Sequence, residues 1–241
     1  MTVWWSRAIL IFALIAAACL PVGALGTRFN LWDFRVGLPV VLLGVLIAAV
    51  VFLGGAVAWF VANGRDLLAD RNAISLGLLV SGLILAVMAL PFYTATSVPP
   101  IHNISTDTEN PPAFGALADA RGDGSNPLAY DSATLAPLQA AAYPWVAPLT
   151  LDQPPATVVA VAAEALRAQG LEVVTEDLAA GMVEAVATSF WFGFKDDLVV
   201  RVVNDGAGSR VDVRSVSRVG QSDLGANARR IGKLLDALKK S

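Results

Sequence analysis

The sequence is short of charge and holds almost no histidine or cysteine. Charged residues make up 15% of its 241 residues and hydrophobic residues 56%, whereas a soluble domain is about one-quarter charged. With one cysteine, Cys19, an intrachain disulfide or a cysteine-based metal site is excluded. The single histidine, His102, has no second histidine and no cysteine with which to share a metal. We therefore expect no cofactor and no metal, and the apolar excess favours a membrane protein.

The motifs of several enzyme classes are also missing. The sequence contains no GxSxG nucleophile elbow, no dinucleotide-binding fingerprint and no phosphate-binding loop. After residue 100 it carries 12 basic and 17 acidic residues, whereas nucleic acid binding needs a basic face for the phosphates. We expect no nucleic acid partner. A reaction cannot be inferred, and an enzyme is the less favoured reading.

Three long apolar runs are present, at residues 8–25, 36–62 and 74–95. A helix of about 20 apolar residues crosses the hydrocarbon core of a bilayer. Aromatic rings, which favour the membrane interface, stand near the run ends: Trp4, Trp5, Trp32, Trp59, Phe92 and Tyr93. The pattern predicts a three-helix transmembrane region over residues 1–98, with the lipid bilayer as its surroundings.

Within this region the second run contains a pair of glycines, Gly54 and Gly55. Small residues allow membrane helices to approach closely. We expect the pair to contact the other helices of the same chain, with a second protein as the alternative. The runs show no buried charge, so nothing indicates a transport path.

The first run has rival interpretations. It resembles a signal peptide with Arg7 at its charged end, and "AAAC" at residues 16–19 resembles a lipoprotein cleavage site. However, Ala16 stands where a leucine is usual, and the residues after Cys19 are apolar instead of polar. We favour an uncleaved helix, because the run approaches spanning length and lacks a clear cleavage end.

Arginines in the short loops predict the orientation. Arg7, Arg65 and Arg71 fall on one side of the predicted membrane, and Arg28 and Arg35 on the other. Because positive residues are enriched on the cytoplasmic side, the N-terminus is expected in the cytoplasm. After three crossings the C-terminal domain then lies outside it. In a bacterium this describes an inner-membrane protein of the cell envelope with a periplasmic domain.

The segment from 99 to 150 is rich in proline, with eight between Pro99 and Pro148. Proline interrupts both helices and strands. We expect a long irregular arm packed on the domain that follows, with one short helix near residues 135–142.

Regular structure is predicted for residues 151–241. Asp152 is a candidate helix cap followed by Pro154 and Pro155, and a final helix is expected from about Ser222 to Lys239. Between the two helices lie four strand candidates, at residues 171–176, 182–192, 197–203 and 210–219, joined by short turns. The fold class is therefore α+β: three transmembrane helices, then a two-layer domain with a four-stranded antiparallel sheet and two helices on one face.

Side-chain alternation divides the last strand between two faces. Val211, Val213, Ser215 and Ser217 share the face that suits the core. The opposite face carries Asp212, Arg214, Val216 and Arg218. In the preceding strand Arg201 also points away from the core. We expect arginines from two strands to share the open face with Glu184 and two aspartates.

Four stretches carry a family resemblance. They are "IHNISTDTENPPAF" (101–114), "YPWVAPL" (143–149), "FGFKDDLVVRV" (192–202) and "RSVSRVGQSDLGANARRI" (214–231). In this order and over most of residues 100–240 the chain resembles the family called domain of unknown function 1499. Similar members often have membrane helices ahead of the domain. The resemblance implies no reaction and no catalytic residues.

The polar stretch at 214–230 is interpreted first as a structural joint. Gly220 permits a sharp turn, Ser222 is a candidate N-cap, and Asp223 suits the positive end of the helix dipole. Asp223, Asn227 and Arg230 lie on one helix side. Arg214 and Arg218 are expected to bind acidic groups of the sheet or of the arm, for example Asp107 or Glu109.

Two alternatives remain open. The first is an anionic ligand or lipid headgroup held near a helix N-terminus, although Asp223 counts against it. Its candidate ligand-binding residues are Arg201, Arg214, Arg218, Ser222, Asp223, Asn227 and Arg230. A distant third is a hydrolase with Ser215, Ser217 or Ser222, His102 and Asp223, which no spacing supports. We expect a binding or structural role, with an envelope protein or anionic lipid as possible partner.

Overall fold

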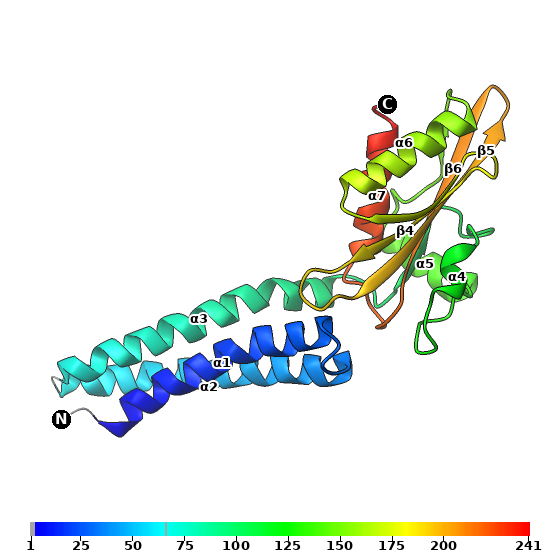
Figure 1. Ribbon diagram of the computed structural model, residues 1–241. Coiled ribbons are helices and arrows are strands. Elements are labelled where there is room, and N and C mark those ends of the chain that lie inside the picture. Colours follow the sequence, from blue (N-terminus) through cyan, green and yellow to red (C-terminus); the bar gives the residue numbers. More distant parts are fainter. Residues whose placement is uncertain (1–2, 66) are drawn as a thin grey trace. The chain divides into compact units, whose positions relative to one another are not determined.

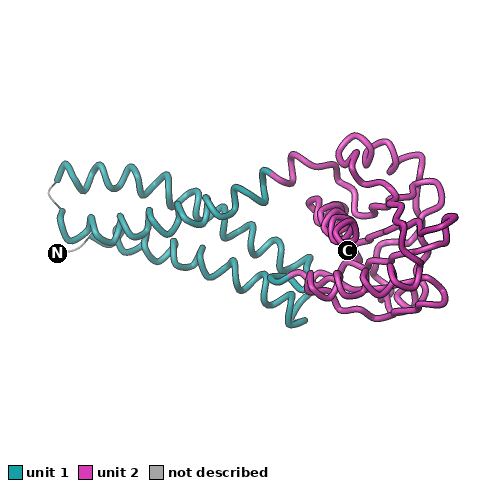
Figure 2. Tube along the Cα trace, turned by 90° about the horizontal axis from the view of Figure 1, so that it is seen from above, with its two compact units in different colours: residues 1–93, 190–193 teal, residues 94–189, 194–241 magenta. Residues whose placement is uncertain are grey.

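The computed structural model describes residues 3–65 and 67–241. Contacts divide the chain into two compact units, coloured separately in Figure 2. Unit 1 comprises residues 1–93 together with 190–193, and unit 2 comprises residues 94–189 and 194–241.

Unit 1 is built from three long helices, shown in blue to blue-green in Figure 1. They are α1 (Trp4–Arg28), α2 (Phe34–Gly64) and α3 (Leu68–Ser97). Each is long and apolar enough to cross a membrane, which confirms the three predicted helices. Asp33 caps α2, because its carboxylate accepts a hydrogen bond from the backbone N–H of Arg35 at 2.8 Å.

Small residues bring α1 and α2 together. A Cβ atom placed on Gly23 would lie 2.5 Å from the backbone oxygen of Gly37, and one on Gly37 would lie 2.1 Å from Thr27 Oγ1. Both distances are too short for any side chain. The contact thus follows the rule that small residues let membrane helices pack backbone to backbone.

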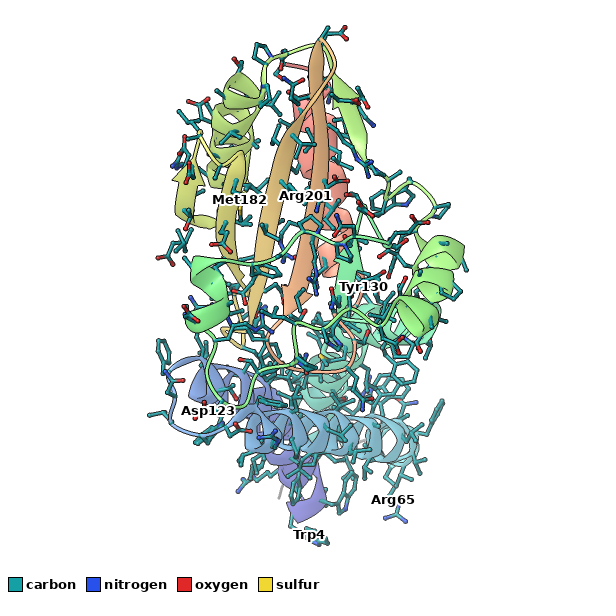
Figure 3. The ribbon with its side chains drawn as sticks, turned by 90° about the vertical axis from the view of Figure 1, so that its right-hand side faces the viewer. Trp4, Arg65, Asp123, Tyr130, Met182 and Arg201 are labelled. Carbon is teal, nitrogen blue, oxygen red and sulfur yellow. The ribbon has the colours of Figure 1, made fainter. Side chains whose placement is uncertain are left out.

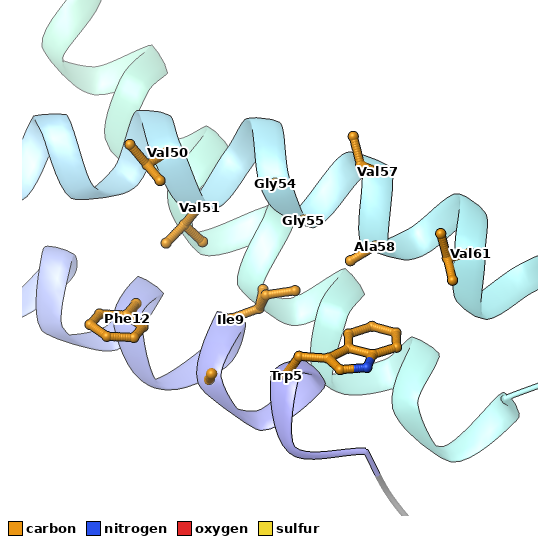
Figure 4. Close-up of a pocket in the computed structure, with 11 residues that line it drawn as sticks. Trp5, Ile9, Phe12, Val50, Val51, Gly54, Gly55, Val57, Ala58 and Val61 are labelled. Atoms are coloured by element: carbon orange, nitrogen blue, oxygen red, sulfur yellow. The ribbon is translucent and has the colours of Figure 1, made fainter.

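The two adjacent glycines of α2, Gly54 and Gly55, have different surroundings. A Cβ atom on Gly55 would lie 3.1 Å from Leu78 of α3 and 3.6 Å from Ile9 of α1, so Gly55 contacts helices of the same chain. A Cβ atom placed on Gly54 would have no neighbouring atom within 4 Å. Gly54 lines an apolar groove of about 460 Å³ between α1 and α2, shown in Figure 4.

Unit 1 does contain a buried carboxylate, which the sequence did not predict. Asp70, near the start of α3, is 2% exposed and accepts hydrogen bonds from the backbone N–H of Val3 (2.9 Å) and from Ser6 Oγ. The helix begins at Leu68, six residues before the apolar run. A hydropathy pattern misses such a residue, because buried hydrogen bonds offset its polarity only in the folded structure.

Unit 2 contains a six-stranded antiparallel sheet. The strands are β1 (Asn103–Ser105), β2 (Leu149–Leu151), β3 (Glu172–Asp177), β4 (Met182–Thr188), β5 (Lys195–Asp205) and β6 (Gly208–Ser217). The order is β1-β6-β5-β4-β3, and β2 also pairs with β6.

The predicted count of four strands was therefore wrong by two. The additional strands, β1 and β2, come from the arm and have three residues each. They share the outer edge of β6: β1 pairs with residues 214–216 and β2 with residues 209–211. Segments this short between prolines show no alternation, so their sequence gives no strand signal.

Two helices cover one face of the sheet, as predicted. They are α6 (Pro155–Ala168) and α7 (Ala226–Leu238), and Figure 1 shows both on the same side of the strands. Between them and the sheet lies an apolar core that includes Val159, Leu166, Leu198, Val213 and Ile231. The shorter helices of the arm, α4 (Ala116–Asp119) and α5 (Ser132–Ala142), lie on the other side.

Both predicted helix caps were misplaced. The residue before α6 is Pro154, which makes no side-chain cap, so Asp152 does not cap the helix. Helix α7 starts at Ala226, four residues later than predicted, after Gly225 in the left-handed conformation (φ 74°). Proline at the start of α6 and a left-handed glycine before α7 favour these ends through their backbone conformations.

Candidate functional site

The polar side of the sheet, opposite α6 and α7, is crossed by the arm. Figure 3 looks onto this side, with Tyr130 of the arm and Arg201 of β5 labelled. We call it the arm face. Alternation along β5 and β6 places Asp197, Arg201, Asp212 and Arg214 there, while the intervening Leu198 enters the core. The predicted facing of these strands is confirmed.

The first ionic cluster of the arm face is centred on Asp197, which has no exposed surface. Arg218 donates to its carboxylate from Nη2 at 2.8 Å and from Nε at 3.0 Å. Arg121, from the arm, donates to the same carboxylate from Nη1. Asp197 therefore joins the sheet to the arm, since one of its two arginines comes from each.

The second ionic cluster joins two arginines to two aspartates. Arg201 Nη2 lies 3.1 Å from Asp107 of the arm and 3.0 Å from Asp212 of β6. Arg210 Nη2 also donates to Asp107, at 3.1 Å.

Arg214 and Arg218 were expected to bind acidic groups of the sheet or of the arm, with Asp107 as one example. Arg218 does bind an acidic group of the sheet, Asp197, but the example was wrong, because Asp107 pairs with Arg201 and Arg210. The backbone N–H of Thr106, the residue before Asp107, donates to the oxygen of Val213 at 2.9 Å, which holds this part of the arm against β6.

The surroundings of Asp107 favour its charged form. Burial alone would raise its pKa, but the backbone N–H groups of Asn110 and Glu109 and the guanidinium groups of Arg210 and Arg201 outweigh it. Together they lower the pKa of Asp107 below its ordinary value of 3.8.

Arg214 is buried without a carboxylate partner among the hydrogen bonds that the structure gives it. It is 5% exposed and stacks between two aromatic rings of the arm, at 5.6 Å from Phe114 and 5.8 Å from Tyr130. Burial lowers the pKa of Arg214 to about 10, and burial raises the pKa of Tyr130 to about 12. The Arg214 guanidinium donates hydrogen bonds to Asn103 Oδ1 and to the backbone oxygens of Pro112 and Leu128.

Glu184 of β4 completes the arm face, which it was expected to share with arginines. It is 1% exposed, and its carboxylate accepts hydrogen bonds from backbone N–H groups of the arm. The donors are Gly115 at 2.7 Å and Leu117 at 3.4 Å. Charge-assisted bonds of this kind satisfy a buried carboxylate without a cation. A sequence cannot reveal this contact, because backbone groups are the same at every position.

A third polar cluster lies on the helix side, around the fully buried Asn227 of α7. Ser215 Oγ donates to Asn227 Oδ1 at 2.7 Å, and Asn227 Nδ2 donates to Ser217 Oγ at 3.0 Å. The amide also donates to the backbone oxygen of His102 at 3.1 Å. Both serine hydroxyl groups are thus buried and hydrogen-bonded, which argues against either as an exposed nucleophile.

Around Asn227 the other predicted residues take separate roles. Arg230 donates to Asp196 at 2.9 Å, and Asp223 accepts from the backbone N–H groups of Gly225 (2.7 Å) and Asn227 (2.8 Å). Burial raises the pKa of Asp223 despite these bonds. Ser222 is not the N-cap, and its hydroxyl accepts from the backbone N–H of Leu224 at 3.2 Å.

The seven residues predicted as a ligand site therefore fall into two groups. Arg201, Arg214 and Arg218 engage the arm face. The remaining four, Ser222, Asp223, Asn227 and Arg230, surround the start of α7. Within residues 3–65 and 67–241, no group of three His, Cys, Asp or Glu side chains is arranged to hold a metal.

Comparisons with known proteins match the domain to one family model. The model described as "Protein of unknown function (DUF1499)" matches residues 103–238. No curated protein matches the chain. Among solved structures, TTHA0849 from Thermus thermophilus is similar over 39% of this chain and 92% of its own, with 16% identity and a TM-score of 0.26.

Proposed function

This chain belongs to the DUF1499 family, whose function is unknown, and we propose that it is a membrane-anchored envelope protein whose α+β domain has a structural or binding role. The domain lies outside the cytoplasm, in the periplasm of a bacterium, and is held at the inner membrane by α1, α2 and α3. An enzymatic role is not part of the proposal.

The observation that carries the proposal is the bonding of Asp197. It is completely buried, and its arginines come from the arm and from the end of β6. Two further carboxylates also join the arm to the sheet: Glu184 of β4 accepts from the backbone N–H of Gly115, and Asp107 of the arm pairs with Arg201. Charged residues on the arm face are thus used to fix the arm on the sheet, as in a structural joint.

The orientation is tested by protease treatment of spheroplasts that express the chain. The arginine asymmetry predicts that residues 99–241 lie outside the cytoplasm. Protease added to intact spheroplasts is then expected to digest the domain, or to cut it from the membrane helices. A domain that resists digestion until the cells are lysed contradicts this topology.

The structural role is tested against anion binding by Arg214→Met and Arg218→Met in the full chain. We expect both variants to unfold at a lower temperature, because each leaves buried acceptors without a donor. We also expect the wild-type chain, reconstituted in a phosphatidylcholine nanodisc, not to bind anionic vesicles. Arg167→Met, on the exposed side of α6, is the control for loss of one positive charge.

The opposite result would favour the alternative function. Binding to anionic vesicles that is lost in Arg214→Met or Arg218→Met, with the unfolding temperature unchanged, would assign these arginines to an anionic lipid headgroup. A pull-down from membranes in mild detergent addresses the binding role directly, and a protein recovered with wild type identifies the envelope partner.

A further inference from the structure

The hairpin tip between β4 and β5 has an unusual composition. It reads "SFWFGF" over residues 189–194. Two hydrogen bonds close it: the backbone N–H of Ser189 donates to the oxygen of Phe194 at 2.8 Å, and the N–H of Phe194 donates to Ser189 Oγ at 2.9 Å. Gly193 supplies the left-handed turn, with φ of 70°. The tip is therefore a defined loop that presents Phe190, Trp191 and Phe192.

Two of these rings are largely exposed. Phe190 is 71% and Trp191 58% exposed, and the rings meet edge to face with centroids 5.1 Å apart. Large aromatic groups gathered on a surface indicate an interaction site. The turn at the other end of β5, at residues 205–208 between β5 and β6, reads "DGAG" and has no aromatic residue. The aromatic character is thus confined to one end.

Contacts assign this tip to the membrane-helix unit. Unit 1 includes residues 190–193. Within it, Arg28 at the end of α1 donates from Nη1 to the backbone oxygen of Phe190, and its guanidinium carbon lies 5.6 Å from the Phe190 ring centre. Three successive crossings bring the ends of α1 and α3 to the same membrane surface. Unit 2 follows α3, so the tip belongs to the side on which α1 ends.

We propose that residues 190–192 insert into the interfacial layer of the bilayer that holds the chain's own helices. Tryptophan and phenylalanine rings favour this layer, and each ring buries about 150–250 Å² when covered. The exposed Lys195, which follows the tip, is placed to meet a lipid phosphate. The domain thereby has two membrane attachments: the covalent one through α3 and the aromatic one through the tip.

A probe in the turn at each end of β5 tests this proposal in the full chain. Cys19→Ala first removes the only natural cysteine. Trp191→Cys then places a polarity-sensitive fluorophore at the tip, and Ala207→Cys places it in the polar turn between β5 and β6. Both proteins are reconstituted in nanodiscs of phosphatidylcholine and phosphatidylglycerol. Far-ultraviolet circular dichroism checks that each labelled protein is folded.

We expect the label at residue 191 to emit at shorter wavelength and to lose at least half its intensity when lipids carry a nitroxide near the headgroup. The label at residue 207 is expected to change by less than one-tenth. Equal, water-like emission and equal quenching at the two positions would overturn the proposal. These nanodiscs contain no second protein. A tip that binds a protein partner and not lipid would therefore also give water-like emission, and the insertion proposal would be wrong in that case too.

A second variant separates insertion from a local effect of the label. Lys195→Cys carries the fluorophore beside an intact tip, and is compared with the same label after Phe190→Ser, Trp191→Ser and Phe192→Ser. The serine tip is expected to shift the emission of residue 195 toward that in water, with the unfolding temperature unchanged. Unchanged emission with an intact fold would contradict insertion of the tip.

Discussion

Asp197 and Leu198 are neighbours on β5, and neither is exposed to solvent. Leu198 points toward α6 and α7 and belongs to the apolar core. Asp197 points toward the arm and lies between Arg121 and Arg218. One face of the sheet is thus held to α6 and α7 by burial of apolar side chains. The other face is held to the arm by buried charged groups, each of which needs its hydrogen-bonding partner. The comparison teaches that equal burial makes the two faces sensitive to different substitutions.

The largest effect is expected from Asp197→Ala. It leaves two guanidinium groups beside each other in a largely buried site, and loss of one partner of a buried pair costs about 3–5 kcal/mol. Urea or thermal unfolding of the full chain in dodecylmaltoside measures this loss. Asp205→Ala, at the exposed end of the same strand, is the control and should change little. Near-wild-type stability of Asp197→Ala would refute the importance of the cluster.

Leu198→Ala is the matched change on the helix face. It removes a fully buried side chain from the core, which costs about 2–5 kcal/mol through lost transfer energy and the cavity left behind. The same unfolding experiment applies, with Val203→Ala as control because Val203 is 42% exposed. Unlike Asp197→Ala, this variant should keep the arm as resistant to limited proteolysis as in wild type under native conditions. Early cleavage of the arm would show that the two faces are not independent.

A smaller, pH-dependent effect is expected from Asp107→Asn. The folded pKa of Asp107 lies below its ordinary 3.8, so the charged carboxylate stabilises the fold above that pH. This contribution is lost as the pH falls through the folded pKa. At pH 7 the variant should be less stable by about 1.5–3 kcal/mol, as for a hydrogen bond to a charged group. Unfolding measured from pH 7 to pH 2 should show the difference shrinking below about pH 4. A stability difference between wild type and Asp107→Asn that stays constant from pH 7 to pH 2 would contradict this prediction.

The smallest effect is expected from Arg167→Ala. Arg167 pairs with Glu176 at 2.6 Å, but their side chains are 51% and 30% exposed. Exposed ion pairs contribute about 0.2–1 kcal/mol, because water screens the charges. Thermal unfolding should shift by no more than about 2 °C in low salt and less in 0.5 M salt. A loss as large as that from Asp197→Ala would show that burial is not what gives the arm-face pairs their strength.

Sequence patterns predicted the parts of the fold that rest on periodicity. The three apolar runs became α1, α2 and α3, and alternation in β6 placed Val213 in the core and Arg214 on the arm face. The stripe of α7, with Ile231 and Leu235, also packs in the core as expected. These successes depend on many residues repeating one spacing.

What the sequence did not predict depends on single long-range contacts. Strands β1 and β2 have three residues each, too few for a period, and form only because β6 offers an edge. The partners of Asp107 and Glu184 are set by how the arm crosses the sheet, and those of Glu184 are backbone groups. The charge pattern indicated which face is polar, but it did not distinguish one pairing from another.

Hydrogen exchange of the arm amides tests the central claim most directly. In the full chain in nanodiscs, the backbone N–H groups of Ser105, Thr106, Gly115 and Leu117 donate to the Gln139 side chain, β6 and Glu184. If the arm is fixed as a joint, these amides should exchange as slowly as neighbouring amides of β5 and β6. Exchange within seconds in the arm, while β5 and β6 remain protected, would contradict the account.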